Sequence, residues 1–127
     1  MKRIFSFFIE QRQLTLFIAI VVTLTIFIGC SLPGSNLPKL TIFEHFDKII
    51  HFLFFFSFFI IWKLYYYKTN FNKYIILLIS IFYGIGIEIY QYYWVIGRSF
   101  DLYDIITDMF GAIAGKYFIE MYNLKTK

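Results

Sequence analysis

The chain has 127 residues, of which 60% are hydrophobic and 24% aromatic, and its formal net charge is +4. Three clean apolar stretches and one stretch interrupted by polar residues are long enough to span lipid, which excludes an ordinary soluble domain and predicts a small integral membrane protein. The positive charge does not indicate nucleic-acid binding, because no basic motif or surface accompanies it.

The first predicted span covers about residues 14–32, and a loop with Pro33 and Pro38 stops it. A second interpretation is open for this region. Basic residues followed by an apolar run and the sequence Phe27-Ile28-Gly29-Cys30 are similar to a bacterial lipoprotein signal, in which Cys30 is lipidated and the preceding residues are removed. We expect the run to remain as a helix, because it is long enough to span the bilayer.

The second predicted span, about residues 47–66, opens with Asp47, Lys48 and His51. A carboxylate, an amine and an imidazole therefore crowd the start of one helix. Asp47 has an equally good structural interpretation, since an acidic residue stabilises the positive end of a helix dipole.

The third predicted span, about residues 75–96, has Gly84, Glu88 and Gln91 at steps of four and three. This spacing places the three residues on one helical face. A carboxyl group at the depth of Glu88 must be protonated, paired or in contact with water.

The fourth predicted span, about residues 102–122, has the most regular pattern. Five residues recur at steps of three and four and share one face: Asp101, Asp104, Asp108, Gly111 and Gly115. The outer half of this face is acidic, and the inner half is a Gly-x-x-x-Gly arrangement that favours close helix packing. We assign Gly84, Gly111 and Gly115 to helix packing, whereas a buried carboxylate at Asp108 needs a partner.

Four crossings make one all-α membrane domain, residues 1–127, with both termini on the same side. Basic residues near span ends are retained in the cytoplasm. Nine of them share the side of the termini: Lys2, Arg3, Arg12, Lys63, Lys68, Lys73, Lys116, Lys125 and Lys127. The other side has only Lys39, Lys48 and Arg98. This bias predicts cytoplasmic termini.

Because neighbouring helices run in opposite directions, the polar ends of the last three spans meet at the outer face. The predicted binding site there consists of Asp47, Lys48, His51, Glu88, Gln91, Arg98, Asp101, Asp104 and Asp108. Five carboxylates face only two permanent cations, so the site is acid-rich. We predict no cofactor and assign no metal, since one histidine with several carboxylates holds a divalent ion only if water or carbonyl groups complete its shell.

The ordered set of residues resembles the VanZ-like membrane proteins. The segments 47–52 and 88–91, then Arg98, then the acidic and glycine face from 101 to 115 follow in the order and at the spacing of that family. The likeness also includes Ser31-Leu32-Pro33 after the first span. One departure is Asp108, where the family commonly has Asn, which adds a negative charge and puts in doubt any role that needs an amide donor.

The resemblance implies a protein of the bacterial cytoplasmic membrane whose site faces the outer leaflet. The founding member is an accessory factor in glycopeptide resistance, associated with low-level resistance to teicoplanin. Implied partners are the membrane and a lipid-linked envelope precursor, a teichoic acid or a lipoglycopeptide. The sequence does not predict an oligomeric state.

Three classes of function remain open. The favoured one is binding of a polar lipid head group or a lipoglycopeptide at the acid-rich site. The alternative is an intramembrane hydrolase or transferase acting on a lipid-linked envelope substrate, with catalytic candidates His51, Glu88, Arg98, Asp104 and Asp108. An ion conductor is least favoured, because the inner halves of the spans lack polar residues to continue a path.

Overall fold

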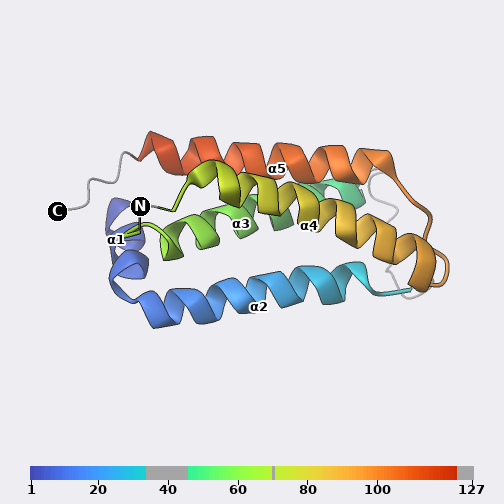
Figure 1. Ribbon diagram of the computed structural model, residues 1–127, viewed down its shortest axis with the longest axis horizontal. Coiled ribbons are helices and arrows are strands. Elements are labelled where there is room, and N and C mark those ends of the chain that lie inside the picture. Colours follow the sequence, from blue (N-terminus) through green and yellow to red (C-terminus); the bar gives the residue numbers. More distant parts are fainter. Residues whose placement is uncertain (34–45, 70, 123–127) are drawn as a thin grey trace.

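The computed structural model describes residues 1–33, 46–69 and 71–122, and these residues form helices and no strands. Figure 1 shows a bundle of long helices with one short helix at an end. The helices are α1 (Lys2–Glu10), α2 (Arg12–Cys30), α3 (Phe46–Tyr65), α4 (Lys73–Trp94) and α5 (Leu102–Met121). The all-α prediction is therefore confirmed.

Helices α2 to α5 coincide with the four predicted spans, and no boundary differs by more than two residues. Helices α2, α3 and α4 are long and apolar enough to cross a membrane. Helix α5 has a similar length but carries four ionisable side chains, Asp104, Asp108, Lys116 and Glu120. That α5 crosses as a fourth span stays a prediction.

Side-chain caps set two of the helix starts. The Asn72 carboxamide oxygen accepts a hydrogen bond from the Tyr74 N–H at 2.9 Å and begins α4. The Asp101 carboxylate accepts one from the Tyr103 N–H at 2.8 Å and begins α5. Each cap satisfies a backbone donor that has no partner within its own helix.

The short helix α1 was not predicted. Its Phe5 is buried and makes edge contacts with two rings, Phe118 of α5 at 6.3 Å and Tyr122 just after α5 at 5.2 Å between ring centroids. The Thr15 hydroxyl donates to the Phe8 carbonyl and fastens α1 to the start of α2. Helix α1 therefore lies at the end of the bundle where α5 finishes (Figure 1).

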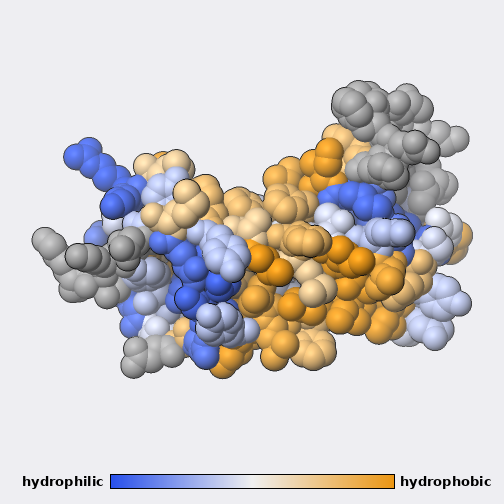
Figure 2. Space-filling view, turned by 90° about the horizontal axis from the view of Figure 1, so that it is seen from above, coloured by the Kyte–Doolittle hydropathy of each residue, from blue (hydrophilic) through white to orange (hydrophobic). Residues whose placement is uncertain are grey.

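Helix α3 is the centre of the bundle and packs most extensively against α5. Its Phe55 and Phe59 are fully buried and fill the interior. In Figure 2, hydrophobic side chains form the middle of the visible face and hydrophilic ones gather toward its ends. Such a band between polar ends is the surface that a bilayer requires.

Candidate functional site

The start of α3, the last third of α4 and the start of α5 meet at the end of the bundle opposite α1 (Figure 1). The polar residues of the predicted site lie there because α4 runs antiparallel to its neighbours. These residues form an ion-pair cluster around Lys48 and a buried triad of His51, Glu88 and Asp104, and the others lie beside these two groups.

Lys48 is the centre of the ion-pair cluster. Its Nζ lies 2.7 Å from Asp101 Oδ2, 2.5 Å from Asp104 Oδ1 and 3.4 Å from Asp47 Oδ2. The hydrogen bond from Lys48 lowers the pKa of Asp101 below its ordinary value. The positive charge of Lys48 is thus shared among carboxylates of its own protein.

His51 lies deeper and bridges two helices. Its Nδ1 is 3.0 Å from Asp108 Oδ1, and only 5% of the His51 side chain and 1% of the Asp108 side chain are exposed. The other ring nitrogen, Nε2, lies 3.9 Å from Asp104 Oδ2, which is beyond hydrogen-bond distance. The His51 ring is therefore fixed by Asp108 at Nδ1, while its Nε2 faces an oxygen of Asp104.

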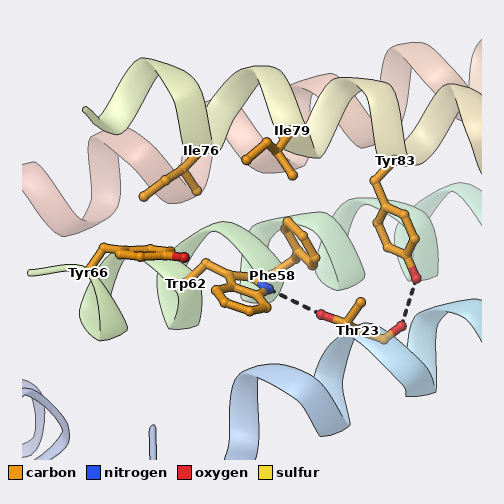
Figure 3. A pocket seen from close by; sticks show the side chains of 7 residues that line it. All are labelled: Thr23, Phe58, Trp62, Tyr66, Ile76, Ile79 and Tyr83. Atoms are coloured by element: carbon orange, nitrogen blue, oxygen red, sulfur yellow. Dashed lines mark hydrogen bonds between the residues drawn. The ribbon is translucent and has the colours of Figure 1, made fainter. Parts of the chain in front are cut away.

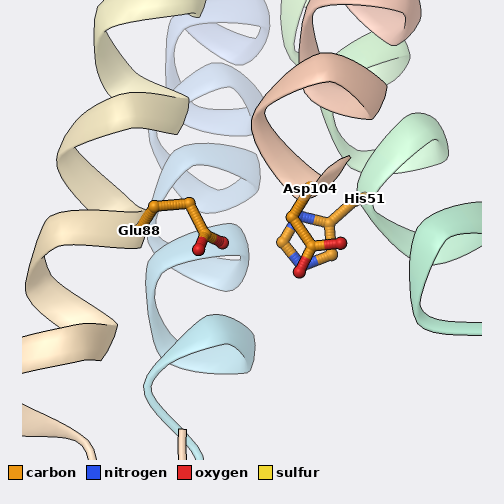
Figure 4. A group of neighbouring side chains, drawn as sticks. All are labelled: His51, Glu88 and Asp104. Carbon is orange, nitrogen blue, oxygen red and sulfur yellow. The ribbon is translucent and has the colours of Figure 1, made fainter. Parts of the chain in front are cut away.

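Glu88 extends from α4 toward His51 and Asp104, and its side chain is fully buried. Its Oε2 accepts a hydrogen bond of 3.0 Å from the Asp101 N–H, while its Oε1 has no partner among the described residues. Figure 4 shows the Glu88 carboxylate pointing toward His51 and Asp104. One nitrogen or oxygen atom from each of these three side chains lies within 4.8 Å of the other two.

Gly84 makes room for this arrangement one turn before Glu88. A Cβ atom at Gly84 would lie 2.8 Å from Asp108 Oδ2 and 3.2 Å from Asp108 Cβ. The absent side chain lets α4 approach the Asp108 carboxylate. The Asp108 Oδ2 atom has no hydrogen-bond partner among the residues that the structure describes.

Gln91 and Arg98 belong to neither group, and Asp47 lies at the margin of the ion-pair cluster. Gln91 Nε2 donates to the Cys30 carbonyl oxygen at 2.8 Å and ties α4 to the end of α2. Asp47 is half-exposed and contacts Lys48 only at 3.4 Å. Arg98 follows α4 and makes no ion pair with the described carboxylates, and its buried Nε has no hydrogen-bond partner among them.

A cavity of about 280 Å³ lies between α2, α3 and α4, away from the triad, and was not predicted. Figure 3 shows its lining, in which the Trp62 indole donates to the Thr23 hydroxyl at 3.1 Å and the Tyr83 hydroxyl donates to the Thr23 carbonyl at 2.7 Å. The rest of the lining is mostly apolar. Thr23 is one of three threonines in α2, so the sequence gives no signal that it lines a cavity.

The triad has a definite chemical character. One nitrogen and two carboxylate oxygens, from buried side chains of three helices, lie within 4.8 Å of one another. Lys48 donates to Asp104 and the Asp101 N–H donates to Glu88. Such an arrangement attracts a cationic group or a metal ion, and it also orients an imidazole as a general base.

Comparison with known protein families matches residues 4–123 to the family described as VanZ/LLP1. The match covers nearly the whole chain and confirms the resemblance found in its residues. No curated protein and no solved structure matches the chain.

Proposed function

The chain belongs to the VanZ/LLP1 family, and from this membership and its buried acidic site we propose a multi-pass protein of the bacterial cytoplasmic membrane that binds the polar head group of a lipid-linked envelope molecule. In this proposal all four long helices cross the membrane, both termini are cytoplasmic, and the site faces the outer leaflet. Teichoic acids, wall precursors and lipoglycopeptides such as teicoplanin are the candidate ligands.

The observation that carries the proposal is the pair of buried carboxylate oxygens without partners among the described residues, Glu88 Oε1 and Asp108 Oδ2. A buried polar atom without a hydrogen bond costs on the order of 1–3 kcal/mol, and more if it is charged. An ammonium group of a ligand supplies hydrogen bonds and charge to both oxygens.

The ion-pair cluster also restricts the chemical groups that a ligand can present to this site. Lys48 is engaged by Asp47, Asp101 and Asp104, so it has little capacity left for a ligand phosphate. Arg98 at the rim is better suited to an anionic group. We therefore favour a zwitterionic head group, with its amine at Glu88 Oε1 and Asp108 Oδ2 and its anionic group toward Arg98.

Binding assays in lipid nanodiscs test this proposal. The purified chain is titrated with short-chain phosphatidylethanolamine, phosphatidylglycerol and teicoplanin as separate probes. We expect the amine-bearing probes to bind more tightly, and Glu88→Gln to weaken their binding at least tenfold. Glu120→Gln, at the opposite end of the bundle, is the matched control. Equal affinity of Glu88→Gln and the parent protein for every probe would contradict head-group binding at this site.

The alternative function is an intramembrane hydrolase or transferase, and the His51–Asp108 contact supports it. A carboxylate on one ring nitrogen orients the imidazole so that the other nitrogen can accept a proton. If this alternative holds, His51→Gln lowers turnover of a lipid-linked substrate by several powers of ten and leaves substrate affinity nearly unchanged. If the protein only binds, the same change alters affinity, and the parent protein has no turnover.

A further inference from the structure

We propose that His51, Glu88 and Asp104 form a binding site for a divalent transition-metal ion of the zinc or manganese type. No metal was assigned from the sequence, because one histidine with several carboxylates holds a divalent ion only if water or carbonyl groups complete its shell. The metal would bind Glu88 Oε1, the atom that the proposed function gives to a ligand amine, so the two would compete there and each is tested separately.

The distances suit a metal ion. Nitrogen and oxygen ligands lie about 2.0–2.2 Å from zinc in a tetrahedral shell, so two ligand atoms on one ion lie roughly 3.4 Å apart. His51 Nε2 and Asp104 Oδ2 are 3.9 Å apart, so a side-chain movement of about 0.5 Å brings both onto one ion. The three side chains have ligand atoms within 4.8 Å of one another, so a small side-chain movement brings Glu88 into the same shell.

Each of the three side chains is anchored by one atom. His51 Nδ1 contacts Asp108, Asp104 Oδ1 accepts a hydrogen bond from Lys48, and Glu88 Oε2 accepts one from the Asp101 N–H. The atoms left to bind a metal ion are His51 Nε2, Asp104 Oδ2 and Glu88 Oε1. Ligands of natural metal sites are oriented by an outer shell of this kind, and a carboxylate on the second nitrogen of a histidine ligand is its most common element.

The remaining atoms all carry a free lone pair, and can donate it to a metal ion, if His51 donates its Nδ1–H to Asp108. In that tautomer the Nε2 lone pair and a carboxylate oxygen face each other at 3.9 Å between side chains that are 5% and 6% exposed. Glu88 Oε1 is buried and has no hydrogen-bond partner among the described residues. Buried acceptors in this arrangement repel one another, and a cation between them removes the repulsion.

The chemical types of the three ligand groups indicate which metal ions the site prefers. One imidazole with two carboxylates suits zinc or manganese, whereas calcium and magnesium prefer shells made only of oxygen. Three protein ligands also leave at least one coordination position open. Water or an oxygen atom of a ligand would occupy that position.

The direct test is metal binding by the full-length protein in detergent after treatment with EDTA. We expect equilibrium dialysis to show one Zn²⁺ per chain with a Kd in the micromolar range or below, and Mn²⁺ to compete. His51→Gln, Glu88→Gln and Asp104→Asn each weaken binding at least 100-fold, and Asp108→Asn, which removes only the anchor, weakens it roughly 10- to 100-fold. Glu120→Gln leaves binding unchanged.

A measurement on the unmodified protein avoids the question of whether the variants fold. X-ray absorption at the zinc edge should show one imidazole nitrogen and carboxylate oxygens in the first shell.

Absence of binding by the parent protein at 1 mM metal, or zinc bound equally by all three ligand variants, would overturn the site. His51 would then act as an imidazolium between Asp104 and Asp108. Zinc binding without affinity for any head group would retain the metal site and contradict only the proposed function.

Discussion

Asp101 connects three helices from the position just before α5. Its carboxylate accepts hydrogen bonds from Lys48 of α3 at 2.7 Å and from the Tyr103 N–H of α5 at 2.8 Å. Its own N–H donates to Glu88 of α4. The same residue therefore caps a helix, neutralises a lysine and anchors a proposed metal ligand.

We predict that Asp101→Ala lowers the free energy of unfolding by about 1–2 kcal/mol, because an N-cap and a charge-assisted hydrogen bond are both lost. Asp101→Asn should cost less, since asparagine keeps the cap. Lys48 lowers the pKa of folded Asp101 below the ordinary 3.8, so the contribution is present above that value and lost as the pH falls through the folded pKa. Unfolding in detergent, followed by circular dichroism, measures both effects.

Asp47→Ala is the matched control for this prediction. Asp47 belongs to the same cluster, but its side chain is 49% exposed and lies 3.4 Å from Lys48. Exposed ion pairs of this kind contribute about 0–1 kcal/mol. A loss of stability in Asp47→Ala as large as that in Asp101→Ala would show that Asp101 has no special capping role.

Helical spacing predicted the shared faces but not the partners of individual side chains. Asp104 and Asp108 follow each other on one face of α5, yet Asp104 contacts Lys48 whereas Asp108 contacts His51. The sequence could not assign these pairs, because spacing along one helix does not fix the axial register between two helices. The position of Gln91 on the Cys30 carbonyl depends on the same unknown register.

At the scale of the elements, the contact between α3 and α5 positions the triad. A Cβ atom at Gly111 would collide with the Phe52 carbonyl oxygen, and one at Gly115 would lie 2.8 Å from the Phe56 carbonyl oxygen. The two glycines therefore let the backbones of α3 and α5 touch. Asp108 lies one turn before Gly111, so this close contact brings its carboxylate to His51.

We predict that Gly111→Ala destabilises the bundle by about 1–3 kcal/mol, because the added methyl group forces α5 away from α3. The separation should also weaken any ligand or metal bound at the triad. Gly86→Ala in α4 is a sharp control, since a Cβ atom there meets nothing within 4 Å. Alanine in an open helical position stabilises by about 0.5–1 kcal/mol, so the two changes should have opposite signs in the same unfolding assay. Equal changes in stability from Gly111→Ala and Gly86→Ala would contradict the role of Gly111 in the close packing of α3 against α5.

The boundaries of the long helices were predictable because apolar runs between turn-forming residues define them directly. Helix α1 was missed because nine residues are too few for a membrane span, and its reason to fold lies elsewhere in the chain. Its Phe5 is buried by Phe118 and Tyr122, more than a hundred positions away. Contacts over such sequence distances have no local pattern.

At the scale of the whole molecule, the ionisable side chains of α5 are accommodated by their partners. Asp104 and Asp108 contact Lys48 and His51 of α3. At the opposite end, Glu120 lies 2.5 Å from Lys73 of α4 and 3.5 Å from Lys116 of its own helix. Pairing lowers the cost of placing these groups beside lipid, which supports α5 as a membrane-crossing helix although its composition is less apolar.

The proposed topology predicts which loops can be labelled from outside the cell. On a Cys30→Ala background, single cysteines replace three exposed residues, Lys68 between α3 and α4, Ser99 between α4 and α5, and Met121 at the end of α5. We expect a membrane-impermeant maleimide to label Ser99→Cys in intact cells, and Lys68→Cys and Met121→Cys only after permeabilisation, because basic residues gather at their end of the bundle.

Two other labelling patterns would contradict the proposed topology in different ways. Labelling of Lys68→Cys and Met121→Cys, but not Ser99→Cys, in intact cells would reverse the orientation and turn the acidic site toward the cytoplasm. Labelling of Ser99→Cys together with Met121→Cys would mean that α5 does not cross the membrane. Since α5 contributes Asp104 and Asp108 to the site, its failure to cross would leave these two residues on a helix outside the bilayer and remove the reason to expect a lipid head group there.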